Sequence, residues 1–225
     1  AEYVYKAQAE GRGVYSFCMC PGGFVVPAST GPEETVVNGM SPANRGSRWA
    51  NSGLVVELHP EDIPATGIRV EDPTSPLALM QWCEAFEHKS YLAANRSLRA
   101  PAQRMTDFVA RRHSSTLPSS SYTMGLTSSD LHDWMPDFIT RRLSAGFRAF
   151  DRTTRGFLTD EAQLIGVESR TSSPVRIPRD RITYAHPVVA GLYPAGEGAG
   201  FAGGIVSAAI DGENAAQQIA LALGR

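Results

Sequence analysis

A glycine-rich run near the end of the chain constrains the fold more than any other segment. Residues Val188–Gly204 read VVAGLYPAGEGAGFAGG, and an apolar stretch, Ile205–Leu223, follows directly. This order predicts a strand, a glycine-rich turn and a helix. Because the N–H groups and the dipole at a helix N-terminus both favour an anion, the run indicates contact with a phosphate-bearing cofactor. Glycines also serve close packing at such junctions, but the six in this run exceed what one turn needs.

The same run does not complete a dinucleotide-binding fingerprint. Gly198, Gly200 and Gly203 satisfy the spacing G-x-G-x-x-G. A fingerprint also needs a second strand after the helix and an acidic residue about 20 positions further on, whereas the printed sequence stops at Arg225. Glu197 lies within the turn, where its carboxylate suits sugar hydroxyls and would repel a pyrophosphate. We therefore expect a terminal strand, turn and helix whose partner strands lie elsewhere.

Composition excludes several classes of protein. The 225 residues are 42% hydrophobic, which is enough for one large domain or two small ones. The net charge of -2 gives no electrostatic reason to expect nucleic acid or an anionic membrane as a partner. No apolar run is long enough to span a membrane, and the N-terminus lacks the apolar segment of a signal peptide. The three cysteines are an odd number, so we expect no disulfide framework and a reducing, cytoplasmic compartment.

The pattern of apolar and turn-forming residues predicts an α+β fold. Short runs rich in Val, Phe and Tyr predict strands at Gly13–Met19, Phe24–Ala28, Thr35–Gly39 and Leu54–Leu58, and two later strands are predicted at Gln163–Ser169 and Pro174–Ile177. Helical spacing predicts one helix over Pro76–Ala94 and another that begins after Pro136. The buried stripe of the second helix is predicted to be Phe138, Ile139, Leu143, Phe147 and Phe150. This order is typical of an α+β domain with a mixed or antiparallel sheet, to which the terminal strand and helix are attached.

A C-x-C pair, Cys18 and Cys20, lies in the first predicted strand and is followed by Pro21-Gly22-Gly23. Residues two apart in an extended strand point to the same side, so both thiols are expected to face one site. The spacing is neither the C-x-x-C of redox pairs nor that of a zinc knuckle, and no second Cys or His pair completes a metal site, so no metal is expected. Two interpretations stay open: small buried side chains, or thiols beside a ligand that the glycine turn lets approach closely.

Two further segments are unusually polar. Gly166–Ile177 reads GVESRTSSPVRI and offers Glu168 and Arg170, the latter with a fixed fork of donors for a carboxylate or phosphate. Residues 38–53 read NGMSPANRGSRWANSG and carry Asn, Ser and Arg side chains suited to a polar ligand. A solvated hairpin edge and an ordinary loop are the alternative interpretations. The five histidines show no metal-ligand spacing and are interpreted as structural or surface residues.

Long stretches of the chain together resemble one known family. They are GRGVYSFCMCPGGFVVPAS, VVNGMSPANRGSRWANSG, APAQRMTDFVA, GFLTDEAQLIGVESRTSSPVRIPRD and GLYPAGEGAGFAGGIVSAAIDG. In this order they closely resemble the C-terminal half of the uncharacterised FAD-dependent dehydrogenases, a branch of the glutathione-reductase-like flavoproteins. The resemblance covers essentially the whole chain and is more specific than any single motif.

The resemblance implies a division of the chain into two parts. Residues 1–186 would form the inserted substrate or cap domain that covers the flavin, and residues 187–225 would form the last strand and helix of a Rossmann-like FAD domain. Complete members carry a dinucleotide fingerprint before this region, so the chain, which begins at Ala1, is expected to be a fragment of a longer protein. The fragment alone is expected to bind little or no FAD and to be inactive.

The resemblance also implies site residues. FAD would be contacted by Gly196, Glu197, Gly198, Gly203, Gly204 and Ile205. Among these, Glu197 would lie beside the ribityl and phosphate part of FAD, and the helix N-terminus would point at the flavin ring. The candidate catalytic residues are Cys18, Cys20, Glu168 and Arg170, because their segments would line the ring and the substrate.

The implied activity is that of an FAD-dependent oxidoreductase, which passes a hydride or an electron pair between an unknown small-molecule substrate and the flavin. NAD(P)H or another electron partner is expected, and the oligomeric state is not predicted. Two alternatives stay open. One is a non-catalytic module that binds a ligand or a protein, and the other is a flavin-independent dithiol redox protein that uses Cys18 and Cys20.

Overall fold

The computed structural model describes residues 4–224, which divide into two compact units. The first unit comprises residues 4–73 and 82–169, and the second comprises residues 74–81 and 170–224. The predicted domain boundary between His186 and Pro187 lies inside the second unit and stays a prediction.

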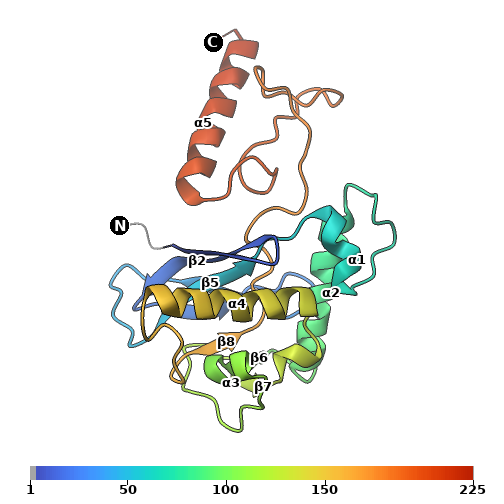
Figure 1. Ribbon diagram of the computed structural model, residues 1–225. Helices are drawn as coiled ribbons and strands as arrows, with labels where there is room; N and C mark the ends of the chain where they lie inside the picture. The colour runs from blue at the N-terminus through green and yellow to red at the C-terminus, as the bar shows by residue number, and fades with distance from the viewer. Residues whose placement is uncertain (1–3, 225) are drawn as a thin grey trace. The chain divides into compact units, whose positions relative to one another are not determined.

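A three-stranded antiparallel sheet, in the order β1-β2-β5, is the centre of the first unit (Figure 1). β1 (Tyr5–Ala9) and β2 (Arg12–Pro21) are joined by a two-residue turn, in which Glu10 and Gly11 both have a positive φ. Positive φ at both positions gives a turn whose twist matches that of the flanking strands. β5 (Ala50–Val56) pairs along the other edge of β2.

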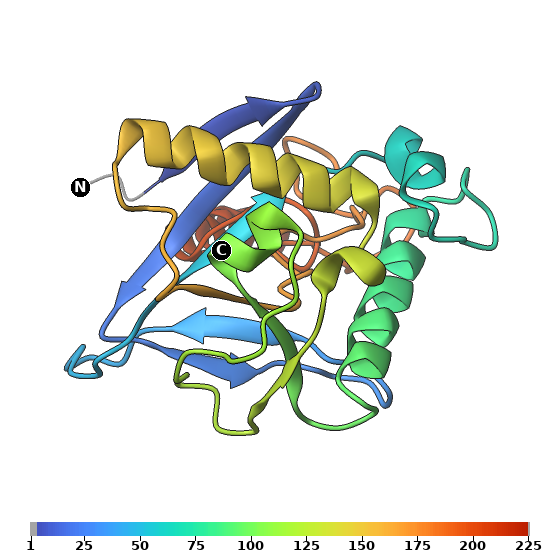
Figure 2. The same ribbon diagram turned by 60° about the horizontal axis from the view of Figure 1, so that its bottom comes forward.

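Helix α4 (Asp137–Thr153) lies across one face of this sheet (Figure 2). Four of its five predicted stripe residues are buried, namely Phe138, Leu143, Phe147 and Phe150, and Ile139 is partly buried against the same core. Gly146 lets the helix backbone approach the sheet, because a Cβ there would stand 2.5 Å from Cγ1 of Val14. The main core of the unit therefore lies between α4 and the β1-β2-β5 sheet.

Two smaller sheets and several short helices complete the first unit. β3 (Phe24–Pro27) and β4 (Val37–Met40) form an antiparallel pair, and β6 (Ala100–Arg104) pairs in parallel with β7 (Leu126–Ser128) and antiparallel with β8 (Gln163–Ile165). The helices are α1 (Ile63–Thr66), α2 (Ala78–Ala93) and α3 (Met105–Ala110), with the 3-10 helices η1 (Pro60–Asp62) and η2 (Leu131–Asp133). Residues 78–81 of α2 are counted with the second unit. Sheets of both kinds together with separate helices confirm the α+β class.

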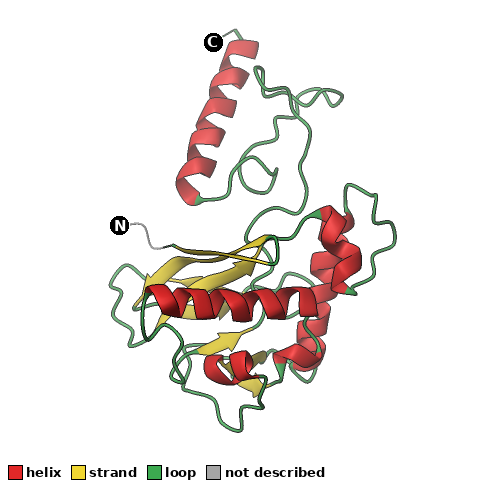
Figure 3. Cartoon of the chain, in the orientation of Figure 1, coloured by secondary structure: helices red, strands yellow, loops and turns green. Residues whose placement is uncertain are grey.

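The second unit contains one long helix, α5 (Ile205–Ala222), preceded by loops and turns (Figure 3). α5 begins where the predicted apolar stretch begins. The strands predicted from Val188 and over Pro174–Ile177 are not formed among the described residues, which show no Rossmann topology. The physical reason is that a strand needs a neighbour for its backbone hydrogen bonds, and residues 4–224 pair no strand with either segment. No helix in this part of the chain has the length and apolar character needed to cross a membrane.

Replacing Gly146 with Ala should destabilise the protein, although alanine is the better helix former. The added Cβ would clash with Val14, which is fully buried, and overpacking of this kind costs about 1–3 kcal/mol. Gly212→Ala is the matched control, because Gly212 lies inside α5 and an added Cβ would meet nothing within 4 Å. That change should stabilise its helix by up to about 1 kcal/mol. Chemical denaturation followed by circular dichroism measures both effects, and equal stabilisation by the two variants would contradict the close contact.

Candidate functional site

A β-bulge in β2 places Cys20 on the same face of the sheet as Phe17. Phe17 pairs with Gly53 and Cys20 pairs with Asn51, so three steps along β2 correspond to two steps along β5. Gly53 and Asn51 are two residues apart and share a face, and Phe17 and Cys20 therefore share it too. The extra residue is accommodated at Cys18, which has a φ of 49° and is exposed. The expectation that both thiols face one site assumed an unbroken strand, and the bulge removes that alternation.

The face that carries Cys20 is the one turned away from α4. Leu54 and Val56 lie on the opposite face of β5 from Gly53, and they pack against the core beneath α4. Glu168, which follows β8, lies over this outer face: its Oε2 is 3.0 Å from the place that a Cβ on Gly53 would take. A Cβ at position 53 would crowd the carboxyl group, which would have to move by a few tenths of an ångström. Burial raises the pKa of Glu168, and within residues 4–224 no ion pair or hydrogen bond holds its carboxyl group.

These surroundings shift the pKa of the Cys20 thiol. Burial and, second, the charge of Glu168 raise the pKa of Cys20, whereas the charge of Arg45 lowers it. The thiol donates a hydrogen bond to the carbonyl of Cys18, at 3.3 Å, and none of the three cysteines is in a disulfide in the described chain. The structure thus brings Cys20 and Glu168 together. It assigns Arg170, the remaining candidate, to the second unit, where the side chain is exposed.

The Pro21-Gly22-Gly23 turn packs against protein backbone and not against an open space. Gly22 has a φ of 62°, and a Cβ on it would stand 1.8 Å from the carbonyl oxygen of Arg45. The Gly23 N–H donates to the carbonyl of Trp49 at 3.1 Å, and Ser47 Oγ donates to the carbonyl of Gly23 at 2.7 Å. These two glycines therefore hold the loop between β4 and β5, residues 41–49. Contact with this loop explains why glycine is needed in the turn, without a ligand.

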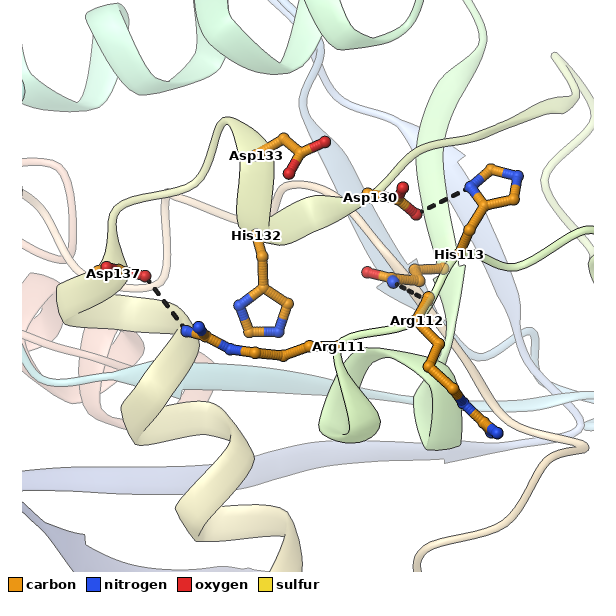
Figure 4. A pocket seen from close by; sticks show the side chains of 8 residues that line it. Arg111, Arg112, His113, Asp130, His132, Asp133 and Asp137 are labelled. Atoms are coloured by element: carbon orange, nitrogen blue, oxygen red, sulfur yellow. Dashed lines mark hydrogen bonds and ion pairs between the residues drawn. The ribbon is translucent and has the colours of Figure 1, made fainter.

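A polar pocket of about 400 Å³ in the first unit was not predicted (Figure 4). It is lined by Gln103, Arg111, Arg112, His113, Asp130, His132, Asp133 and Asp137. Several of its charges are paired within the protein, His113 with Asp130 at 3.0 Å and Arg111 with Asp137 at 3.4 Å. The sequence held one signal for it, the Arg-Arg-His run at 111–113. Across the described residues, no three His, Cys, Asp or Glu side chains gather as they would around a metal ion.

In the second unit, a buried ion pair holds the glycine-rich turn against α5. Arg179 donates to both carboxylate oxygens of Asp211, at 2.6 and 2.9 Å, and the Gly196 N–H donates to the same carboxylate at 2.8 Å. The guanidinium also lies over the rings of Phe201 and Tyr184, at 3.6 and 4.0 Å from their centroids. The hydrogen bonds from Arg179, together with that from Gly196, lower the pKa of Asp211.

The segment Pro174–Ile177, which was predicted as a strand, runs along this turn. The Ile177 N–H donates to the carbonyl of Ala199 at 3.1 Å, and Arg176 Nε donates to the carbonyl of Gly200 at 3.1 Å. Gly200 has a φ of 81° and passes so close to Val175 that a Cβ would stand 2.6 Å from its carbonyl oxygen. The backbone of Ile177 and the side chain of Arg176 therefore satisfy two carbonyl groups of the turn.

Part of the turn stays open. A Cβ on Gly198 or Gly203 would meet nothing within 4 Å, and Glu197 is exposed. Gly204 is the N-cap of α5 and provides no side-chain cap, and Ile205 is 92% exposed. Of the residues predicted to contact a cofactor, Glu197, Gly198, Gly203 and Ile205 are therefore exposed, whereas Gly196 and Gly204 are half-buried and the Gly196 N–H is bonded to Asp211. The start of α5, which has no side-chain cap, fits a polar or anionic group.

Replacing Asp211 with Asn should loosen the glycine-rich turn. The change leaves Arg179 buried without its counter-charge, which costs about 2 kcal/mol or more. Because folding lowers the pKa of Asp211, the stabilisation is present above the unfolded pKa of about 3.9 and is lost as the pH falls through the lower folded value. The protection of the Gly196 amide from hydrogen exchange, relative to the intrinsic rate at the same pH, should therefore fall at neutral pH in the variant, but only in acid in the unchanged protein. Glu213→Gln, an exposed change on the same helix, is the control; equal exchange in both variants would contradict the role of the pair.

Comparison with known protein families assigns the chain to one of them. A family model described as FAD-dependent protein, C-terminal domain-like, matches residues 1–171. A relative from Clostridium beijerinckii, named only as an uncharacterized protein, is 41% identical over 218 residues, which are 96% of this chain and 39% of the relative. The chain thus spans about two fifths of the length of the curated relative that it matches. Since the family model covers well over half of its length, the chain belongs to the family of FAD-dependent proteins with this C-terminal domain.

Proposed function

We propose that this chain is part of an FAD-dependent oxidoreductase that passes a hydride or an electron pair between a small-molecule substrate and the flavin. Membership of the FAD-dependent family carries the proposal. The open glycine-rich turn supports it, because uncapped backbone N–H groups lie where the proposal needs a cofactor contact. FAD, when bound, supplies the redox chemistry, and the protein supplies orientation and electrostatics.

The cofactor would be held by Gly196, Glu197, Gly198, Gly203, Gly204 and Ile205. The missing Cβ atoms at Gly198 and Gly203 let an extended ligand lie against the backbone. The exposed carboxylate of Glu197 accepts hydrogen bonds from sugar-like hydroxyls. The first N–H groups of α5 favour negative charge on the group that they face. In this proposal, the ion pair between Arg179 and Asp211 keeps the turn in position.

We further propose that residues 1–186 are a substrate domain and that residues 187–225 complete an FAD domain made mostly by other parts of a longer protein. The length of the relative supports this division, because the matched region is only 39% of it. The surface of α5 also supports it: Ile205, Val206 and Leu221 are 92%, 71% and 67% exposed. Large apolar side chains on one helix are typical of a surface that packs against further protein.

On the substrate side, we propose Cys20 and Glu168 as the residues that face the reacting molecule, with Cys18 and Arg170 as further candidates. NAD(P)H or another electron partner would complete the reaction, in the cytoplasm. The dithiol alternative has less support, because the bulge at Cys18 breaks the alternation that would aim both thiols at one site. A non-catalytic binding module stays the alternative if the longer protein proves unable to hold FAD.

The 225-residue chain on its own should purify colourless and bind FAD weakly. It offers one exposed turn to the cofactor, and its G-x-G-x-x-G spacing is not followed by a second strand among the described residues. Titration with FAD, followed by visible absorbance and by fluorescence of the flavin, measures the affinity. A stoichiometric yellow complex would show that the cofactor site is not shared with other parts of a longer protein.

Replacing Glu197 with Ala in the longer protein should lower the occupancy of FAD and leave the melting temperature nearly unchanged. The change removes one or two charge-assisted hydrogen bonds to the cofactor, each worth about 1.5–3 kcal/mol. Glu213→Ala is the control, because Glu213 is an exposed carboxylate within α5, outside the glycine-rich turn. If the free energy of unfolding falls by about 1 kcal/mol while the affinity for FAD is unchanged, Glu197 interacts only with the helix dipole and the assignment of this turn is wrong.

A further inference from the structure

The bulge in β2 brings Cys20 within reach of Glu168. Without the extra residue, the pairing of Phe17 with Gly53 would continue to Cys20 and Ala50, and Cys20 would point toward the other face of the sheet. With it, Cys20 is opposite Asn51, two residues along β5 from Gly53. Diagonal neighbours of this kind have Cα atoms within about 7–8 Å, and the carboxyl group of Glu168 lies directly over Gly53.

Two charged groups act on the thiol, one of each sign. Arg45 is exposed, so water screens its charge, whereas Glu168 is partly buried and has no ion pair within residues 4–224. A charge interacts more strongly with its neighbours where water is excluded. Burial of the thiol raises the pKa of Cys20 most; the charge of Glu168 raises it further, and the charge of Arg45 opposes both to a smaller extent.

We propose that Cys20 and Glu168 form one proton-exchange pair, which serves the reaction by giving or taking a proton rather than by attacking the substrate. The charge of an ionised Glu168 opposes ionisation of the thiol. The bulge acts as the positioning device, since it sets the face on which the thiol stands. Of the two groups, the carboxyl has the open approach, because no ion pair or hydrogen bond occupies it in the described chain.

The pair indicates the class of substrate, a point that rests on the proposed oxidoreductase function. A proton donor is needed where a carbonyl or imine carbon gains a hydride: the O–H bond of the carboxyl group breaks, and a bond from the proton to the substrate oxygen or nitrogen forms. The pair then regains its proton from water. In the reverse direction, an alcohol or amine loses its proton to the carboxylate as the neighbouring carbon loses a hydride. The substrate is therefore a carbonyl-alcohol or imine-amine couple.

Alkylation of the 225-residue chain by iodoacetamide tests the pair without flavin. The rate at each cysteine is measured by mass spectrometry over a range of pH, because only the thiolate reacts. At neutral pH, Cys20 should react more slowly than glutathione under the same conditions. Glu168→Gln should accelerate Cys20 by about three- to tenfold, as expected when a nearby negative charge is removed, and should change the rate at Cys18 by less than about twofold.

Two more variants make the test decisive. Gly53→Ala keeps every charge but adds a Cβ 3.0 Å from the carboxyl group and 3.2 Å from the Phe17 ring, so a small displacement of the carboxyl group should accelerate Cys20 to a smaller extent. Glu161→Gln removes an exposed carboxylate and should leave the rate unchanged. Equal rates at Cys20 in the unchanged protein, the Glu168 variant and the Gly53 variant would overturn the pair, and so would a thiol faster than glutathione. If circular dichroism shows that Glu168→Gln does not fold, Gly53→Ala decides. Failure of the longer protein to bind FAD would not alter these rates, so the two proposals fail separately.

Discussion

The pairing of β2 with β5 is the constraint on which the first unit depends. Near the start of β2, the register places Val14 beneath α4, where the side chain is fully buried. A slip of one residue would turn the apolar set of either strand to the other face, so the core holds this register. The bulge at Cys18 lies further along, where β2 gains a residue without disturbing that core. Near the start of β2, the pair of strands packs against α4. Near the end of β2, the bulge turns Cys20 toward the face away from α4.

Local patterns located the two long helices and five of the strands of the first unit, but not its short helices, its other strands or the irregularities between them. The strands from β2 to β5 and the buried stripe of α4 were predictable, because period-2 and helical spacing depend only on neighbours in sequence. The bulge had no such signal, since Cys18 takes a positive φ that few residues of its kind adopt. β6 also escaped prediction: it reads APAQR, which is poor in β-branched and aromatic residues, and its pairing with distant strands outweighs that weak propensity.

The same limit applies to the candidate site. Cys20 and Glu168 each stood out by residue type, but the room that Gly53 leaves for a carboxyl group is visible only in the fold. Conversely, Gly22 resembled a ligand-facing glycine and proved to be a point of backbone contact. In the second unit, the glycine-rich turn was recognised from its own sequence, whereas the group that orders it, Arg179, lies outside the run. Long-range partners of this kind leave no local trace in a sequence.

The positive φ of Cys18 means that the two positions of the C-x-C motif have different requirements. Position 18 has a left-handed backbone conformation, which glycine, asparagine and aspartate adopt more readily than cysteine. At Cys20 the demand is chemical and involves two partners, the carboxyl group of Glu168 and the bare Cα of Gly53. The two cysteines of the motif are therefore not equivalent: the first stands at a backbone position that favours turn-forming residues, and the second stands on the face of the sheet that Glu168 covers.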